Sequence, residues 1–138
     1  MAPSRVDLFG AFAKQIASIE KGRTAPVIDV GNLEAVRDLT DVRDTVRAYR
    51  DILDRGRPGV VYNVCSGKPY KIREVLDGLV KLSRVPVEVR VDPARYRPND
   101  TPVLLGNPTR LQTEIGWRPL VPLSQTLSDL LDYWRQEG

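Results

Sequence analysis

Apolar residues recur along the chain at two spacings, and each spacing predicts one kind of element. Where they return every three or four residues, a helix would carry them on one face. Gly22 and Gly56 each follow such a stretch, and Thr40 or Asp41 is placed to cap the second one. The pattern predicts four long helices, over residues 6–21, 41–53, 70–84 and 123–136.

Short runs rich in valine predict the strands. Val27–Val30 and Val60–Cys65 are compact runs bounded by turn residues, so each reads as a buried strand. Residues 85–91 alternate valine with polar residues, which is typical of a half-buried strand. The stretch 33–40 is ambiguous between helix and strand.

A fifth, shorter helix is predicted from its end signals. Asn107 is a good N-cap, Pro108 suits the first helical position, and Gly116 follows the end. Trp117 is expected to pack inward. Helical and strand patterns alternate, and 138 residues suffice for one domain with a core. The sequence therefore predicts a single α/β or α+β domain, with a small sheet of short strands and about five helices.

Composition narrows the function. Hydrophobic residues make up 41% of the chain and charged residues 28%, as in ordinary soluble globular proteins. No apolar run approaches the roughly 20 residues that cross a bilayer, and no signal peptide opens the sequence, so we expect a cytoplasmic protein without a membrane partner. The formal charge of +3 is spread along the chain, which argues against nucleic-acid binding and suits a small anionic ligand.

The single cysteine, Cys65, and the lack of histidine exclude several kinds of site. The chain cannot form an internal disulfide, and neither a structural zinc site nor a Ser-His-Asp or Cys-His mechanism can be assembled from it. The segment "CSGKPYK" is not a phosphate loop, because Tyr62 stands where such a loop needs a glycine before Gly67. We interpret Cys65 as a buried thiol.

Two arginine-rich segments are candidates for anion binding. Arg95, Arg97 and Asp100 surround Pro98, which stiffens the chain, so a guanidinium there could hold a phosphate with two hydrogen bonds. Arg37 lies in a run of alternating charges and could point from a strand end into a cleft. Solvated surface is the alternative interpretation of both segments, and the residues alone leave the two open.

The order of three motifs resembles a known family. They are "VGNLEAVRDLTDVRD", "GVVYNVCSGKPYKIREVL" and "RVDPARYRPNDTPVLLGNPTRLQTEIGWRPLVPLSQTLSDLLDYWR". In this order they resemble the C-terminal, substrate-binding part of extended short-chain dehydrogenase/reductases that act on nucleotide sugars, the NAD-dependent epimerase/dehydratase family. Within it, the pattern is similar to GDP-mannose 4,6-dehydratases and GDP-4-keto-6-deoxy-mannose reductases.

The resemblance implies a binding role for four residues. Arg37 matches the family's arginine that contacts the diphosphate. Arg97 matches a second phosphate arginine, and Asp100 a carboxylate directed at the ribose. Asn32 matches a turn near the base. The implied partner is a nucleotide-diphosphate sugar, most simply a GDP-linked one. Lys14 lies near a basic phosphate contact of some members, but the local match does not assign it.

The resemblance also implies what the sequence does not contain. Full members carry a Rossmann cofactor region with a glycine-rich turn and a catalytic Tyr-x-x-x-Lys, and neither motif occurs here. We therefore expect residues 1–138 to form one substrate-binding domain that binds no cofactor itself, although the full-length family uses NADP(H). Catalytic competence of this chain stays open. In full members a strand like Val60–Cys65 completes the large sheet, so alone it would expose an edge and favour a dimer or a rearranged sheet.

Three functions remain open from the sequence. The first is the substrate-binding domain of a GDP-sugar dehydratase or reductase, inactive alone. The second is a non-catalytic interaction or regulatory module that oligomerises or pairs with a full-length homologue. The third is an enzyme completed by a separate chain that carries the cofactor domain.

Overall fold

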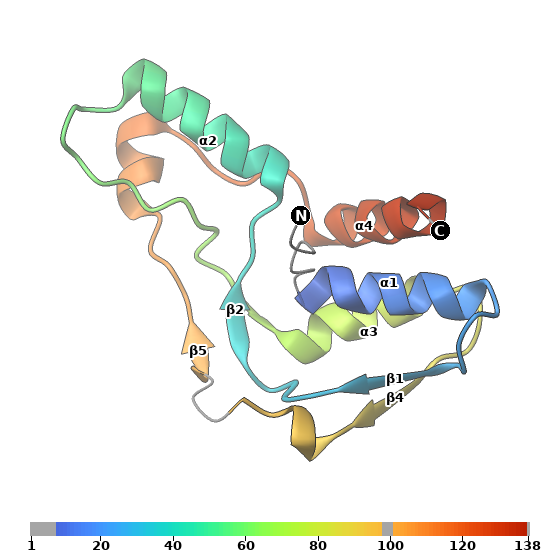
Figure 1. The fold of residues 1–138 in the computed structure, drawn as a ribbon. Coiled ribbons are helices and arrows are strands. Elements are labelled where there is room, and N and C mark those ends of the chain that lie inside the picture. The colour runs from blue at the N-terminus through green and yellow to red at the C-terminus, as the bar shows by residue number, and fades with distance from the viewer. Residues whose placement is uncertain (1–7, 98–100, 138) are drawn as a thin grey trace, which may run out of the picture.

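Three helices pack on a two-stranded sheet and form the larger core (Figure 1). In the computed structural model, which describes residues 8–97 and 101–137, they are α1 (Leu8–Glu20), α3 (Ile72–Leu82) and α4 (Leu123–Glu137). The sheet pairs β1 (Val27–Val30) with β4 (Glu88–Val91) in parallel. Together with α2 (Val42–Arg55), these elements confirm the four long helices, the strand at 27–30 and the end of the strand at 85–91, and with them the α/β class.

The ends of the three helices are tied together by one charged side chain. Arg135 near the end of α4 donates to both carboxylate oxygens of Glu20 on α1, at 2.8 and 2.7 Å. It also donates to the carbonyl of Leu82 at the end of α3. The hydrogen bond from Arg135 lowers the pKa of Glu20, although burial acts in the opposite direction. Because this ion pair is nearly buried, it fixes how the apolar faces of the helices meet.

A second sheet has three strands and lies between the larger core and a smaller one described below. Its central strand is β2 (Val36–Asp38), so the ambiguous stretch 33–40 contains a strand. On one side β2 pairs antiparallel with β3 (Pro69–Lys71), and on the other it pairs in parallel with β5 (Val103–Leu104). The strands are only two or three residues long, so side-chain hydrogen bonds described below add to their pairing.

A smaller core lies under α2 (Val42–Arg55), away from the three packed helices (Figure 1). Asp41 is the N-cap of α2 and accepts from the amide of Arg43 at 2.8 Å. The inward packing predicted for Trp117 is confirmed, because its side chain is buried here with Ala48 and with residues of the short turn η2 (Leu111–Ile115).

The predicted short helix forms, with a wider last turn. The Asn107 side chain accepts from the amide of Thr109 at 3.0 Å, and Gly116 ends the helix at a φ of 77°, as its end signals predict. Between them, η2 is a π-helical turn rather than an α-helical one. The 3₁₀ turn η1 (Pro93–Arg95) completes the helical elements of the described residues and is capped by Asp92.

The prediction of a strand at Val60–Cys65 is wrong. The segment runs back alongside α2 as an extended chain, but it belongs to neither sheet. No backbone carbonyl within residues 8–97 and 101–137 accepts from the amides of 61–65. The physical reason is that a strand needs a neighbouring strand to pair with, and nothing in the local sequence supplies one.

The apolar residues whose spacing predicts α2 are exposed in the structure, whereas the sequence pattern would place them in the core. Val42, Val46, Tyr49 and Leu53 form one face, and each residue is 57–87% exposed. The helix is instead held by its other face, where Asp44 and Ala48 are buried. An apolar stripe of this kind, facing solvent, is typical of an interaction surface.

Asp44 is the polar anchor of the smaller core. Its carboxylate accepts from the amides of Leu120 and Val121 at 3.1 and 3.0 Å and from Arg47 at 2.8 Å. Its backbone carbonyl accepts from the indole of Trp117 at 3.0 Å. Burial raises the pKa of Asp44, but the hydrogen bonds from Arg47 and the two amides outweigh it, so the pKa lies below its usual value.

Replacing Asp44 with Asn tests this anchor. An amide nitrogen would face donors that now bind a carboxylate, so we expect the free energy of unfolding to fall by about 2–4 kcal/mol. Urea unfolding would measure the loss. Asp54→Asn on the same helix is the control, because Asp54 is exposed and its replacement should change stability by less than about 0.5 kcal/mol. Equal effects of the two substitutions would contradict the assignment.

Candidate functional site

Three of the four residues to which the resemblance gives a binding role border one cleft of about 530 Å³, which we call the arginine cleft. Its walls come from the first half of α1, the end of β1 with the turn 31–33, the strand β2, and the segment after β4. Arg37, Arg97 and Asn32 all line it, as does Arg95. Asp100 lies outside the described residues. Lys14 does not line the cleft, because its ammonium lies over the ring of Trp134, 5.3 Å from the centroid.

Arg37 is held by two backbone carbonyls, one in β2 itself and one just before β5. Its Nη1 donates to the carbonyl of Val36 at 2.8 Å and to the carbonyl of Thr101 at 2.7 Å. The amide of Val36 in turn donates to the carbonyl of Pro102 at 2.8 Å. These bonds fix the guanidinium where the segment before β5 meets β2. Arg97 also lines the cleft and is exposed.

The turn after β1 brings Asn32 to the cleft and requires a glycine before it. The Asn32 Oδ1 accepts from the amide of Glu34 at 2.9 Å, which closes a tight side-chain turn. A Cβ at Gly31 would lie only 2.8 Å from the carbonyl oxygen of Arg95. This close approach seats the turn η1 against the end of β1, so the two segments form one wall of the cleft.

Asp38 is the residue that builds this region, and the sequence patterns did not identify it. Its carboxylate accepts from the amide and hydroxyl of Ser66 at 2.8 and 2.7 Å, from the amide of Gly67 at 2.8 Å and from the amide of Gly106 at 3.2 Å. Two amides of "CSGK", those of Ser66 and Gly67, therefore face a carboxylate, which would repel a phosphate. No local sequence motif could have revealed this role of Asp38, because its hydrogen-bond donors lie 28 to 68 residues away along the chain.

Cys65 does not have the environment of a nucleophile. Burial raises the pKa of its thiol, and the nearby charge of Asp38 raises the pKa further. The thiol also packs on Gly106, where an added Cβ would lie 2.5 Å from the sulfur. Cys65 is therefore a packing residue, although it is only partly buried rather than buried as predicted.

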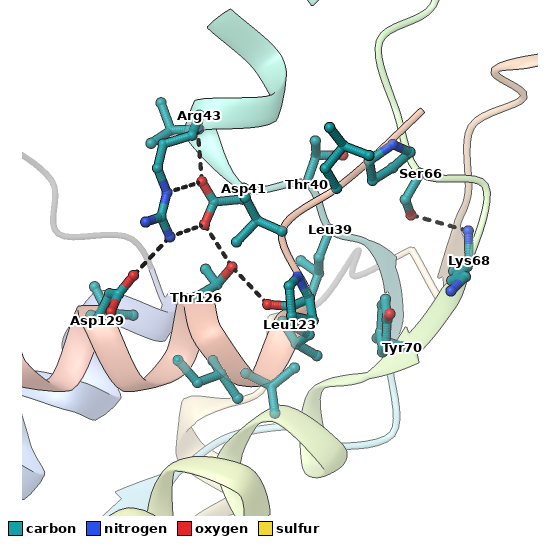
Figure 2. A pocket seen from close by; sticks show the side chains of 18 of the residues that line it. Leu39, Thr40, Asp41, Arg43, Ser66, Lys68, Tyr70, Leu123, Thr126 and Asp129 are labelled. Carbon is teal, nitrogen blue, oxygen red and sulfur yellow. Dashed lines mark hydrogen bonds and ion pairs between the residues drawn. The ribbon is translucent and has the colours of Figure 1, made fainter. Parts of the chain in front are cut away.

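A second cleft of about 880 Å³, the apolar cleft, adjoins the first (Figure 2). Phe9 and Leu39 line both. Its polar wall is an ion-pair network in which Arg43 binds Asp41 and Asp129, at 2.9 and 2.8 Å, while Thr126 donates to Asp41 at 2.6 Å. The hydrogen bonds from Arg43 lower the pKa of Asp41 against the effect of burial, and the bond from Thr126 adds to them. The network joins the start of α2 to α4.

Two kinds of site are not found in residues 8–97 and 101–137. No group of cysteine, aspartate and glutamate side chains there is arranged to hold a metal ion. None of the helices formed by these residues is long and apolar enough to cross a membrane. The side chains that line the arginine cleft include guanidinium and amide groups, which suit recognition of a phosphorylated ligand.

Comparisons with known proteins agree with that chemistry. The family model described as GDP-mannose 4,6 dehydratase matches residues 8–130. The GDP-6-deoxy-D-mannose reductase of Pseudomonas aeruginosa is 37% identical over 136 residues, which cover 97% of this chain and 45% of the reductase. The GDP-mannose 4,6-dehydratase of Vibrio cholerae is 26% identical over 131 residues, or 74% of this chain and 35% of that enzyme.

Solved structures show the same fold. RMD from Pseudomonas aeruginosa, complexed with NADPH, superposes with a TM-score of 0.90 and 32% identity, over 99% of this chain and 45% of RMD. UDP-glucose 4-epimerase from Thermotoga maritima, with UDP-glucose, has a TM-score of 0.77 at 22% identity over 95% of this chain and 40% of its own, which shows the fold alone. The chain therefore spans less than half the length of these relatives.

The Asp41 network predicts how stability depends on pH. The pKa of Asp41 is lower in the folded than in the unfolded chain, so its contribution is complete above about pH 5 and is lost as pH falls through the unfolded value of about 3.9 toward the folded one. Urea unfolding at pH 7, 5, 4 and 3 would measure the loss. Asp41→Asn should be less stable than the wild type at pH 7 and show a shallower decline below pH 4. An unchanged slope in that variant would contradict the assignment.

Proposed function

The chain belongs to the GDP-mannose 4,6-dehydratase family, and from this premise we propose that it binds the nucleotide-diphosphate part of a GDP-linked sugar in the arginine cleft. It would do so as the substrate-binding part of a GDP-sugar dehydratase or reductase, without being catalytically competent alone. The single observation that carries the proposal is the convergence of Asn32, Arg37 and Arg97 on one cleft, although Arg37 and Arg97 are sixty positions apart in the chain.

The roles of the residues follow from their chemistry. A guanidinium binds phosphate oxygens with paired hydrogen bonds and keeps its charge at any physiological pH. Arg37, fixed by backbone carbonyls, would hold one phosphate, and Arg97, on the more exposed wall, would close on the other. Asp100 would accept from the ribose hydroxyls and Asn32 would lie near the base. The cleft volume of about 530 Å³ falls within the range of small-molecule sites, about 300–1,000 Å³.

NADP(H) does not fit the residues of this chain. The sequence has neither a G-x-G-x-x-G turn nor a Tyr-x-x-x-Lys pair. The glycine-containing segment "CSGK" directs the amides of Ser66 and Gly67 at the Asp38 carboxylate, not at a ligand phosphate. We therefore assign no step of hydride transfer to these residues. That chemistry would belong to the part of the relatives that this chain does not match.

Calorimetric titration of the purified chain with GDP-mannose, GDP and UDP-glucose would test the proposal. We expect saturable binding, tighter for the two guanine nucleotides. Replacing Arg97 with Ala should weaken it by about 1.5–3 kcal/mol, the scale of a hydrogen bond to a charged group.

Lys81→Ala is the matched control, because it removes the same charge from an exposed position on α3 outside both clefts. Binding that is unchanged in Arg97→Ala would show that this segment does not hold the ligand. No binding of any of the three ligands by the wild type would overturn the proposed function.

A specific surface supports a second candidate function, that of an interaction module. The amides of 61–65 have no backbone partner among the described residues, and the apolar stripe of α2 faces solvent. Unpaired extended backbone recruits another strand, and the stripe would bury apolar area at the same time. Since every copy carries the same surface, we propose a second copy of this chain as the occupant.

Light scattering over a concentration series would test this pairing. We expect the mass to rise from the 15.5 kDa monomer toward a dimer, and Leu53→Glu, which places a charge in the stripe, to keep the chain monomeric. Tyr133→Glu on α4 is the control, since it is also exposed but lies outside the stripe. A monomer at all concentrations would exclude self-pairing. If that monomer also failed to co-purify with a coexpressed full-length homologue, the module function would be wrong.

A further inference from the structure

Two residues beside the end of β1 have the chemistry to choose the base of the ligand. We propose that Asp29 and Arg95 read the edge of a guanine base in the arginine cleft, and that they select GDP-linked over UDP-linked and ADP-linked ligands. This inference rests on the function proposed above and concerns the same cleft. Neither residue is assigned a role by the resemblance of the sequence motifs.

Elimination within the cleft leads to this pair. Arg37 and Arg97 are assigned to the diphosphate, so the base must be read by the other polar side chains of the lining. Asp38 already accepts from four donors, and the Asn32 oxygen already accepts from a backbone amide. Gln15 also lines the cleft, but its side-chain nitrogen donates to the carbonyl of Ala11 within α1, at 3.4 Å. The remaining charged groups of the lining are the Asp29 carboxylate and the Arg95 guanidinium.

Asp29 and Arg95 are neighbours because of the contact at Gly31. The Arg95 carbonyl lies where a Cβ on Gly31 would be, so the turn η1 rests against the chain two residues after Asp29. The charge of Arg95 is also felt at Asp29. The main cause of the lowered pKa of Asp29 is its hydrogen bond from Arg90, and the charge of Arg95 acts in the same direction.

Both groups keep capacity for a ligand. Arg90 donates to the two Asp29 oxygens at 2.7 and 3.3 Å, but a carboxylate offers about four lone-pair sites. Arg95 makes a long ion pair with Asp92, 3.8 Å from Nε, and its side chain is 56% exposed. An ionised carboxylate accepts only, and a guanidinium donates only, so the pair presents one acceptor and one donor face.

That arrangement matches guanine better than the other bases. Guanine presents the acceptors O6 and N7 to a guanidinium, and its N1–H and N2–H₂ donors to a carboxylate. Adenine offers an amino donor where the guanidinium needs an acceptor, and its N1 acceptor would face the carboxylate. Uracil can use O4 and N3–H, but its O2 would oppose the second carboxylate oxygen. We therefore expect affinity to fall from GDP to UDP to ADP.

Calorimetric titrations with GDP, UDP and ADP would test the assignment. Arg95→Ala and Asp29→Asn should each weaken GDP binding about tenfold or more while changing UDP binding much less, so that the preference for guanine collapses. Arg95→Lys keeps the charge but not the paired donors, and it should lose most of the preference as well. Arg97→Ala should weaken all three ligands alike, because it acts on the diphosphate.

Arg90→Ala is the control for the ion pair with Asp29. It leaves the Asp29 carboxylate in place and should retain the preference for GDP. Equal weakening of all three ligands in Arg95→Ala and Asp29→Asn would overturn the base-reading roles while leaving the proposed function intact. Failure of the wild type to bind any nucleotide would overturn both. If Asp29→Asn does not fold, Arg95→Lys decides, because its exposed side chain can be exchanged without disturbing the core.

Discussion

The structure depends on one carboxylate that joins segments distant in the sequence. Asp38 ends β2 and accepts four hydrogen bonds, three from Ser66 and Gly67 and one from Gly106. The strands it stabilises are only two or three residues long, so their backbone pairing alone would be weak. By holding the chain before β3 and the chain after β5 on either side of β2, Asp38 fixes the position of Arg37, the preceding residue.

Asp41 and Asp44, three and six positions after Asp38, also bind segments that are distant in the sequence. Asp41 caps α2 and connects it to α4 through Thr126, while Asp44 in the first turn connects it to the amides of 120 and 121. A carboxylate near a helix N-terminus is also favoured by the helix dipole. In the sequence, the alternating charges of "RDLTDVRD" resemble solvated surface. In the structure, two of its three carboxylates are buried. Each joins the centre of the chain to a different C-terminal segment.

Sequence patterns predicted the fold where an element's environment is set by its own residues. The stripes of α1, α3 and α4 are buried against one another, so period and burial agree. The sequence patterns failed at Val60–Cys65, because a strand requires a partner that the pattern does not encode. They also failed at α2, because its buried face is formed by Asp44 and Ala48 rather than by its valines. For the cleft, the resemblance pointed to Asn32, Arg37 and Arg97. Arg95 stood in the arginine-rich loop already noted, whereas Asp29 was only a polar position in a strand.

The two cores explain why the chain presents two different surfaces. The arginine cleft is built on the larger core, since α1 and β1 supply most of its walls. The open backbone of 61–65 and the stripe of α2 are supported by the smaller core under α2. Between them run β2 and the segment through Asp41, held by the aspartates described above. Asp38 lies next to Arg37 in the sequence and also binds Ser66 and Gly67, which directly follow the segment 60–65. The proposed ligand cleft and the proposed pairing surface are thus separate in position, and the aspartate-rich segment lies between them.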